Sequence, residues 1–176
     1  TLQLAELLAA EHEGGAPAAT CADDIAYWQY SSGTTGMPKG VMHVHSSPRV
    51  MAENAGRRIG YREDDVVFSA AKLFFAYGLG NALSFPMSVG ATTVLNPDRP
   101  TPAAVFGMLE KHQPTIFCGV PTLFGAMLHD ADHARHPGSK RLRISTSAGE
   151  ALPDHIGTAW RKRFGSDILD GVGSTW

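Results

Sequence analysis

Tyr30-Ser31-Ser32-Gly33-Thr34-Thr35-Gly36-Met37-Pro38-Lys39-Gly40 is the stretch on which the fold assignment depends. It gathers hydroxyl side chains, three glycines and one lysine in a short segment. Glycine lets backbone N–H groups turn toward an anion and lets the anion approach closely. The hydroxyls add hydrogen-bond donors, and Lys39 adds a point charge suited to phosphate. The pattern therefore predicts a phosphate-binding loop.

Two other interpretations of this stretch are weaker. A Walker A motif requires Ser or Thr directly after its lysine, whereas Gly40 follows Lys39 here. A flexible Ser/Gly linker does not need Pro38 and Lys39 in its middle, nor an aromatic strand leading into it.

Outward from this loop, short β-branched and apolar runs recur at nearly even spacing. They occupy residues 25–30, 66–68, 91–95, 115–117, 143–146 and 167–169. Segments long enough for helices lie after them, at 47–59, 77–88, 101–112, 121–129 and 153–164. Several of these begin with proline or threonine, which the first turn of a helix tolerates.

Alternation of strand and helix predicts an α/β fold with a mostly parallel sheet and flanking helices. The strands read as solid apolar runs, which indicates burial on both faces. Ligands of such sheets bind at the carboxyl ends of the strands. We therefore expect the site in the loops after the strands, at 31–40, 70–80, 119–122, 147–152 and 170–176.

Composition excludes several classes of protein. The chain of 176 residues has 43% hydrophobic and 18% charged residues, as a globular domain does, and a net charge of −2. This charge argues against nucleic acid and anionic lipid as partners. Neither a signal peptide nor a membrane span is predicted, so we expect a cytoplasmic protein.

Of the two cysteines, Cys118 lies in an apolar run and is expected to be a buried, inert thiol. We place an N-terminal helix and linker at 1–24 and an α/β domain at 25–176.

Three segments together carry a resemblance to a known family. The loop at 31–40, Ser147-Ala148-Gly149-Glu150-Ala151-Leu152-Pro153 and Asp170-Gly171-Val172-Gly173-Ser174-Thr175 occur in the order typical of adenylate-forming enzymes. With the segment at 72–81, the chain most resembles benzoate-CoA ligases, and in particular part of their N-terminal domain.

The resemblance implies that a carboxylate attacks the α-phosphate of ATP and that coenzyme A then takes up the acyl group. It implies Mg²⁺ with the ATP, and catalytic roles for Lys39 and Thr175. It further implies nucleotide contacts by these residues: Ser31, Ser32, Gly33, Thr34, Thr35, Gly36, Lys39, Gly149, Glu150, Asp170, Gly171, Val172 and Thr175.

The same resemblance implies a slot for a small aromatic carboxylate. Phe75, Ala76 and Tyr77 would line it, with Ala148 and Gly173 opposite. A flat ring needs a narrow apolar slot with small residues on one side. The neighbouring Phe74 is expected to be an ordinary core aromatic.

Other candidate residues are ambiguous. His43 and His45 either assist a triphosphate or form a strand pair with one exposed face. Glu150 either contacts nucleotide or metal, or serves only the dipole of a helix. The histidines at 129–136 have no metal-ligand spacing and fit a solvated helix end and loop, so no metal ligand is assigned.

The sequence departs from the family pattern at two positions. Trp176 stands where a glutamate that assists Mg²⁺ is usual, and Val172 where many relatives have an aromatic residue against adenine. The mobile C-terminal domain of the family is not in the sequence, so we expect this chain alone not to turn over. An adenylation module that loads a carrier protein and a non-catalytic nucleotide-binding remnant are the alternatives.

Overall fold

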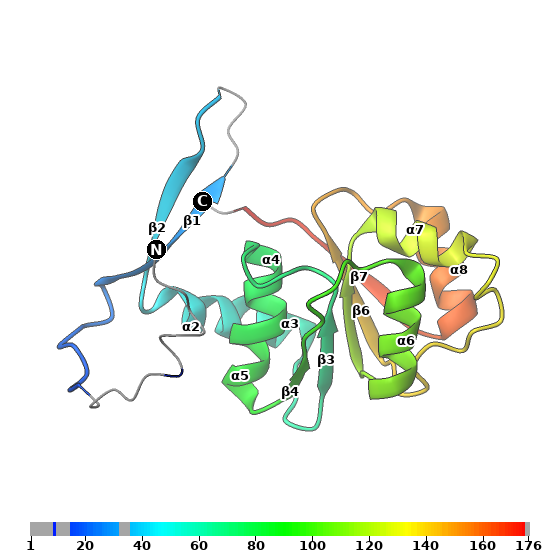
Figure 1. The fold of residues 1–176 in the computed structure, drawn as a ribbon, viewed down its shortest axis with the longest axis horizontal. Coiled ribbons are helices and arrows are strands. Elements are labelled where there is room, and N and C mark those ends of the chain that lie inside the picture. Colours follow the sequence, from blue (N-terminus) through cyan, green and yellow to red (C-terminus); the bar gives the residue numbers. More distant parts are fainter. Residues whose placement is uncertain (1–8, 10–14, 32–35, 175–176) are drawn as a thin grey trace.

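A five-stranded parallel sheet forms the centre of the fold. The computed structural model describes residue 9 and residues 15–31 and 36–174. The sheet has the order β4-β3-β5-β6-β7, and each neighbouring pair is parallel. Its strands are β3 (Val66–Ser69), β4 (Thr92–Val94), β5 (Ile116–Gly119), β6 (Ile144–Ala148) and β7 (Asp167–Gly171). The predicted α/β class is confirmed (Figure 1).

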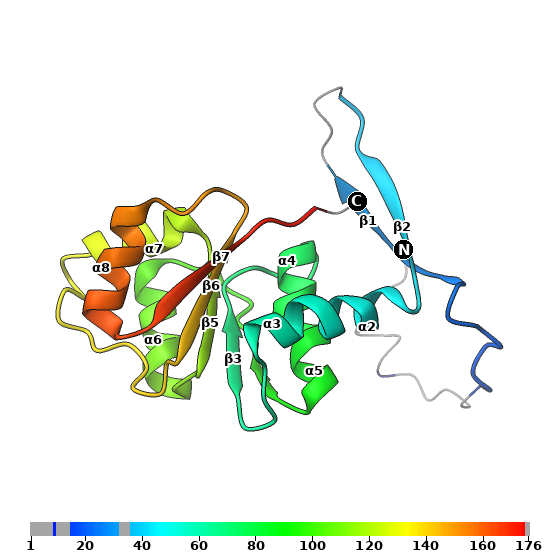
Figure 2. The same cartoon turned by 180° about the vertical axis from the view of Figure 1, so that it is seen from behind.

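Helices cover both faces of this sheet (Figures 1 and 2). One face carries a helix built from α2 (Ser47–Met51), η1 (Ala52–Gly56) and α3 (Arg57–Ile59), and a second from α4 (Ala76–Leu79), η2 (Gly80–Ser84) and α5 (Phe85–Val89). The other face carries α6 (Pro102–His112), α7 (Pro121–His129) and α8 (Asp154–Phe164). None of the described helices is long and apolar enough to cross a membrane.

Helix starts follow the predicted pattern. Thr101 caps α6 by accepting a hydrogen bond from the N–H of Ala104 at 3.3 Å, and Pro102 occupies the first turn. Pro121 likewise opens α7. Proline lacks the N–H that the first turn leaves unpaired, so it stabilises these starts at little cost.

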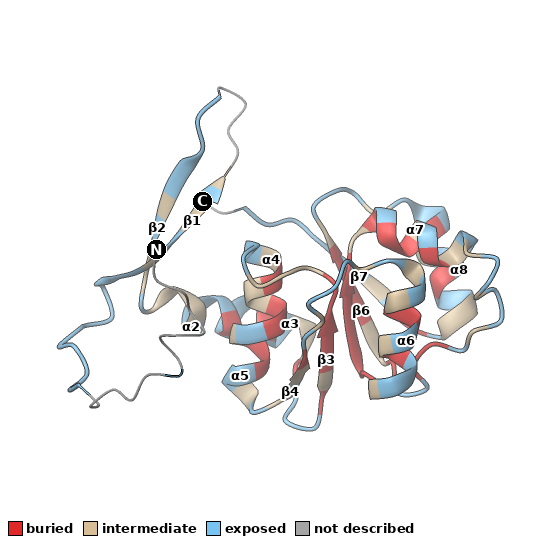
Figure 3. Cartoon of the chain, in the orientation of Figure 1, coloured by how far each residue is buried: buried red, intermediate tan, exposed pale blue. Residues whose placement is uncertain are grey.

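The sheet separates two hydrophobic cores, and buried residues line both of its faces (Figure 3). The three central strands are almost completely buried, as their solid apolar runs predict. On the α6–α8 face, Phe117 packs between Phe68, Phe124 and Trp160. The edge strand β7 is mostly exposed, so burial on both faces holds for the centre of the sheet and not for its edge.

The first predicted strand lies outside the parallel sheet. β1 (Ile25–Ser31) pairs antiparallel with β2 (Lys39–Val44) in a separate two-stranded hairpin. The prediction that all the strand runs belong to one mostly parallel sheet was therefore wrong for β1. The run at 41–44 provides a partner immediately after a short loop, and adjacent antiparallel pairing needs no crossover helix.

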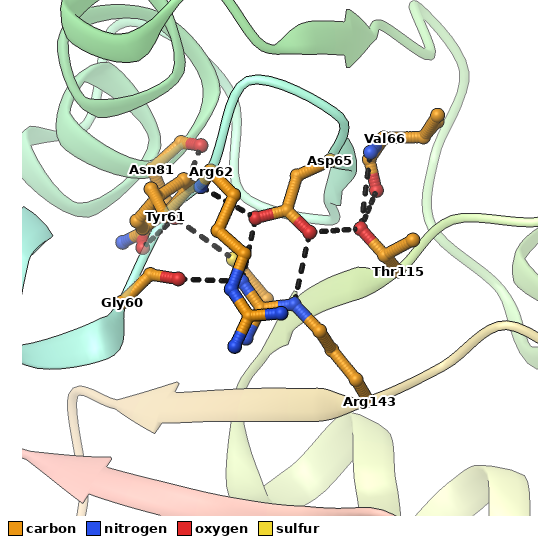
Figure 4. A network of polar contacts seen from close by, with 9 residues as sticks. Gly60, Tyr61, Arg62, Asp65, Val66, Asn81, Thr115 and Arg143 are labelled. Carbon is orange, nitrogen blue, oxygen red and sulfur yellow. Dashed lines mark hydrogen bonds and ion pairs between the residues drawn. The ribbon is translucent and has the colours of Figure 1, made fainter.

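A buried carboxylate joins the amino ends of three neighbouring strands (Figure 4). Asp65, directly before β3, accepts hydrogen bonds from Thr115 Oγ1 at 2.6 Å and from Arg143 Nη2 at 2.5 Å. Thr115 directly precedes β5, and Arg143 directly precedes β6. The Arg143 guanidinium also donates to the carbonyl of Gly60 at 2.6 Å, where α3 ends. One side chain thus fixes how these elements start relative to one another.

Asp65 is held in its charged form. Burial opposes ionisation, but the hydrogen bonds from Arg143, Thr115 and the N–H of Arg62 outweigh it and lower the pKa of the Asp65 carboxyl below its ordinary value of 3.8. Because the folded-state pKa is the lower one, the carboxylate stabilises the fold fully above pH 3.8, and this contribution is lost as the pH falls through the folded-state pKa.

We expect Asp65→Asn to lower the free energy of unfolding by about 3 kcal/mol at pH 7, because it leaves the partly buried Arg143 guanidinium without its counter-charge. Urea unfolding measures this difference, which should shrink below pH 3.8. Asp64→Asn, at an exposed neighbouring carboxylate, is the control and should change stability little. Equal effects of the two variants would contradict this role of Asp65.

Candidate functional site at the carboxyl ends of the strands

Three of the predicted site segments meet at the carboxyl edge of the sheet. Residues 75–77 follow β3, residues 148–150 lie at the end of β6, and residues 170–173 lie at the end of β7. Ala148 and Gly171 are register partners in neighbouring strands. Residues 172–174 leave the sheet in the direction of the hairpin (Figures 1 and 2). The topology thus brings together segments far apart in sequence.

The hairpin carries the described ends of the predicted phosphate loop. Ser31 closes β1, Lys39 opens β2, and the two residues are paired across the hairpin. Lys39 is exposed, and Gly36 is exposed with φ +108°, a conformation that favours glycine. Gly40 lies under the Tyr30 ring, where an added Cβ would be 3.3 Å from it. The predicted ligands Ser32, Gly33, Thr34 and Thr35 lie outside the described residues, as does Thr175.

A groove of about 430 Å³ lies between this hairpin and the segment after β3. Tyr27, Trp28 and Gln29 of β1 line one side, and Leu73, Phe74 and Leu79 line the other. Phe74 is 75% exposed, so the expectation that it is a core aromatic was wrong. The chain leaves the sheet after β3 and turns into α4, which takes Phe74 out of the core despite its apolar neighbours.

Phe75 and Ala76 are exposed at the start of α4. Phe75 is the N-cap residue, in an extended conformation, and its ring is tilted against that of Phe74 at 4.4 Å. Gly78 is buried in α4, and an added Cβ would lie 2.0 Å from the carbonyl oxygen of Lys72. This close approach fixes the turn that presents residues 75–77.

Tyr77 connects this turn to β6. Its hydroxyl lies 2.7 Å from Thr146 Oγ1, and its side chain packs against the core on the α2–α5 face. Burial, the Cys118 thiol and the Asp170 carboxylate all raise the pKa of the Tyr77 hydroxyl, whereas the hydrogen bond with Thr146 lowers it. Burial dominates, so Tyr77 is a neutral phenol at ordinary pH.

The loop after β6 has open space beside its backbone at Gly149. Gly149 has φ +96°, and an added Cβ would meet nothing within 4 Å. Glu150 is exposed and precedes α8 by several residues, whereas Asp154 occupies the first helical turn. The alternative in which Glu150 serves only the helix dipole is therefore disfavoured, because that interaction is confined to the first turn.

Near the end of β7, Asp170 is partly engaged within the protein, since one carboxylate oxygen accepts a hydrogen bond from the N–H of Leu152 at 3.0 Å. This bond links the loop that follows β6 to the end of β7. Val172 and Gly173 are exposed, with Val172 fully so. Among the described residues, no three His, Cys, Asp or Glu side chains gather into a group that would hold a metal ion by themselves.

The structure also places the residues with ambiguous roles. His43 lies on β2 and stacks on Tyr27 with ring centroids 5.0 Å apart. In the segment after α7, His133 bonds Asp130 at 2.9 Å and stacks on Phe106. Cys118 is fully buried, and burial raises the pKa of its thiol to about 11, so the expected buried thiol is confirmed.

Sequence reasoning missed two residues that shape this edge. Lys72 donates to the carbonyls of Asn96 and Asp98 at 2.5 and 2.6 Å and so ties the segment after β3 to the one after β4. The Thr146 hydroxyl, on β6, shares a hydrogen bond with the Tyr77 hydroxyl. A lysine inside an apolar stretch signals the first, but nothing local in the sequence signals the second.

The chain is similar to known proteins over nearly its whole length. The model of a family described as AMP-binding enzyme matches residues 2–175. The 4-hydroxybenzoate–CoA/benzoate–CoA ligase of Rhodopseudomonas palustris is 73% identical over 175 residues, which are 99% of this chain and 32% of that protein. The crystal structure of a benzoate CoA ligase from Burkholderia xenovorans LB400 matches with a TM-score of 0.87 and 50% sequence identity. The match covers 97% of this chain and 34% of the ligase chain.

The anthranilate CoA ligase AuaEII, solved in complex with anthranoyl-AMP, is a further structural match. The match has a TM-score of 0.86 and 41% sequence identity, and it covers 90% of this chain and 31% of the AuaEII chain. The chain thus spans about a third of the length of these relatives.

We expect Gly78→Ala to destabilise the fold by about 3 kcal/mol or to shift the turn at 72–77, because the new methyl group would overlap the Lys72 carbonyl. Thermal unfolding measures the loss. Gly107→Ala is the matched control, since Gly107 lies exposed within α6 with open space around it and should gain up to about 1 kcal/mol. A neutral Gly78→Ala would show that the close approach is not required.

Proposed function

The chain belongs to the AMP-binding enzyme family, and on that premise we propose that it builds part of the site of an aromatic acid–CoA ligase. The carboxylate of a benzoate-like acid attacks the α-phosphate of ATP, which gives an acyl-adenylate and releases pyrophosphate. The thiol of coenzyme A then attacks the acyl carbonyl, and AMP leaves. The reaction fits a cytoplasmic enzyme that handles small substrates.

The observation that carries this proposal is the meeting of three segments at one edge of the sheet, in a chain 73% identical to a benzoate-activating ligase. The segment after β3 supplies aromatic side chains, whereas the ends of β6 and β7 supply alanine and glycines. A flat acyl group fits between such surfaces. We assign Phe75, Ala76 and Tyr77 to one side of the slot and Ala148 and Gly173 to the other.

We assign the nucleotide to the same edge, between the hairpin and the loops after β6 and β7. Lys39 and the backbone of Gly36 suit the phosphates, since both residues are exposed and an ammonium group stabilises developing phosphate charge. Gly149 and residues 170–172 suit the adenosine. We also assign residues 31–35 of the loop and Thr175 to contacts with the nucleotide.

Mg²⁺ fits this site only together with ATP. A magnesium ion commonly takes one or two carboxylates and completes its shell with substrate phosphates and water. Glu150 is exposed at the edge, and Asp170 has one oxygen free of the bond to Leu152. These residues would hold a nucleotide-borne ion, which would neutralise phosphate charge.

Replacement of the matching segment of the R. palustris ligase by this chain gives a complete enzyme, which we call the grafted ligase. We expect it to form benzoyl-CoA, and Lys39→Ala to lower kcat/KM for ATP about a hundredfold, because the transition state loses a positive charge. ATP–pyrophosphate exchange measures this step. Lys111→Ala, an exposed lysine at the end of α6, should have no effect. No benzoate activation by the unaltered grafted ligase would refute the proposed function.

A larger side chain in the proposed slot should weaken binding of the aromatic acid without weakening binding of ATP. Ala148→Leu in the grafted ligase places a larger side chain at the end of β6, and we expect KM for benzoate to rise about tenfold while KM for ATP changes little. Initial rates at varied benzoate and varied ATP separate the two effects. Ala103→Leu, on the exposed side of α6, serves as control. A rise confined to the KM for ATP would place Ala148 in the nucleotide site instead.

A further inference from the structure

A buried network holds Tyr77 at two points, its hydroxyl and its backbone carbonyl. The hydroxyl lies 2.7 Å from Thr146 Oγ1, and the carbonyl accepts a hydrogen bond from Asn81 Nδ2 at 3.0 Å. Asn81 Oδ1 in turn accepts from the Tyr61 hydroxyl at 2.8 Å. The Tyr61 hydroxyl lies 3.8 Å from Cys118 Sγ, and Cys118 lies beside Thr146, its register partner on β6. We call these five residues the Tyr77 network.

Tyr77 and Asn81 lie one turn apart in the helix after β3, and the other members of the network come from elements far apart in sequence. Cys118 and Thr146 are register partners on β5 and β6, so their side chains lie next to each other on one face of the sheet. Figure 4 shows the hydrogen bond between Tyr61 and Asn81, and Tyr61 packs with Cys118 in the core on that face. Exposure is 8% for Tyr61, 4% for Asn81, 0% for Cys118 and 4% for Thr146. Water therefore has little access to replace a lost partner.

The Asn81 amide sets the direction of the hydrogen bonds around it. The Asn81 amide must turn its nitrogen to the Tyr77 carbonyl, which leaves its oxygen facing Tyr61. The single Tyr61 proton goes to that oxygen, so the Cys118 S–H donates to Tyr61. The Tyr77 and Thr146 hydroxyls share one hydrogen bond, in which either oxygen can be the donor.

This order requires neutral phenols and a neutral thiol. Burial raises the pKa of the hydroxyls of Tyr61 and Tyr77 and takes the pKa of the Cys118 thiol to about 11. Each group therefore keeps its proton at ordinary pH.

We propose that the Tyr77 network positions Tyr77 within the aromatic-acid slot, which makes Tyr61, Asn81, Cys118 and Thr146 positioning residues for the acyl group. This inference rests on the proposed function, since it assigns Tyr77 to the acid slot. A different setting of the Tyr77 ring would break its hydrogen bond with the buried Thr146 hydroxyl, which water has little access to replace. Small displacements of a group that orients substrate have large effects on rate.

The test uses the Thr146 hydroxyl, which touches Tyr77 directly. In the grafted ligase, Thr146→Val keeps the shape of the side chain but removes its hydroxyl, and we expect KM for benzoate to rise about tenfold with KM for ATP unchanged. Thr146→Ser keeps the hydroxyl and should restore the benzoate KM. Cys118→Ala interrupts the network one residue further away and should raise the benzoate KM in the same direction.

Ser145→Ala is the matched control for general loss of stability. Ser145 adjoins Thr146 on β6 but faces α8, where its buried hydroxyl accepts from Trp160 Nε1 at 3.2 Å. This variant should lower the melting temperature while the benzoate KM stays constant. A benzoate KM that is unchanged in Thr146→Val, or that rises equally in Ser145→Ala, overturns the proposal.

The unaltered grafted ligase separates this proposal from the proposed function, which fails if that enzyme does not activate benzoate. In that event, crystal structures of the grafted ligase and its Thr146→Val variant still decide the positioning role. A Tyr77 side chain that moves in Thr146→Val and keeps its place in Thr146→Ser supports the network, whereas an unmoved Tyr77 in Thr146→Val overturns it.

Discussion

The carboxylate of Asp65 holds the amino ends of β3, β5 and β6 in one register. Thr115 and Arg143, which directly precede β5 and β6, both bond it, and its side chain is only 2% exposed. In a parallel sheet, the position at which strands start determines where they end, because each residue advances the chain by a nearly constant length. The loops that follow the carboxyl ends therefore depend on an interaction at the opposite edge. A buried ion pair of this kind contributes less to net stability than to the choice of one arrangement.

The strands transmit that register to the candidate site. Thr146 lies beside Cys118 because β5 and β6 are aligned, and this alignment lets both side chains reach the partners that hold Tyr77. Ala148 lies beside Gly171 for the same reason. A shift of one residue in a strand would turn its side chains to the other face of the sheet. Thr146 would then face α8, and Ser145 would take its place toward Tyr77. The fold and the proposed acid slot are thus linked through strand pairing rather than through loop sequence.

Local patterns in the sequence predicted much of this architecture. The solid apolar runs at β3, β5 and β6 and the proline and threonine helix starts are local signals, and the structure confirms them. Phe74 was misassigned because hydrophobicity alone does not show where the chain leaves the sheet. β1 was misplaced because strand character does not specify a partner. The Tyr77 network joins residues from four separate segments, and such pairings follow from topology, which single-sequence patterns do not determine.

The most direct test of the account is a crystal structure of the grafted ligase with benzoyl-AMP bound. The account predicts the benzoyl ring between Tyr77 and Ala148 at the carboxyl edge of the sheet, with the phosphate near Lys39. A further groove of about 740 Å³ lies between α2 and α5, and none of the predicted site residues lines it. Benzoyl-AMP in that groove, or at the sheet edge with its aromatic ring away from Tyr77, would contradict the account.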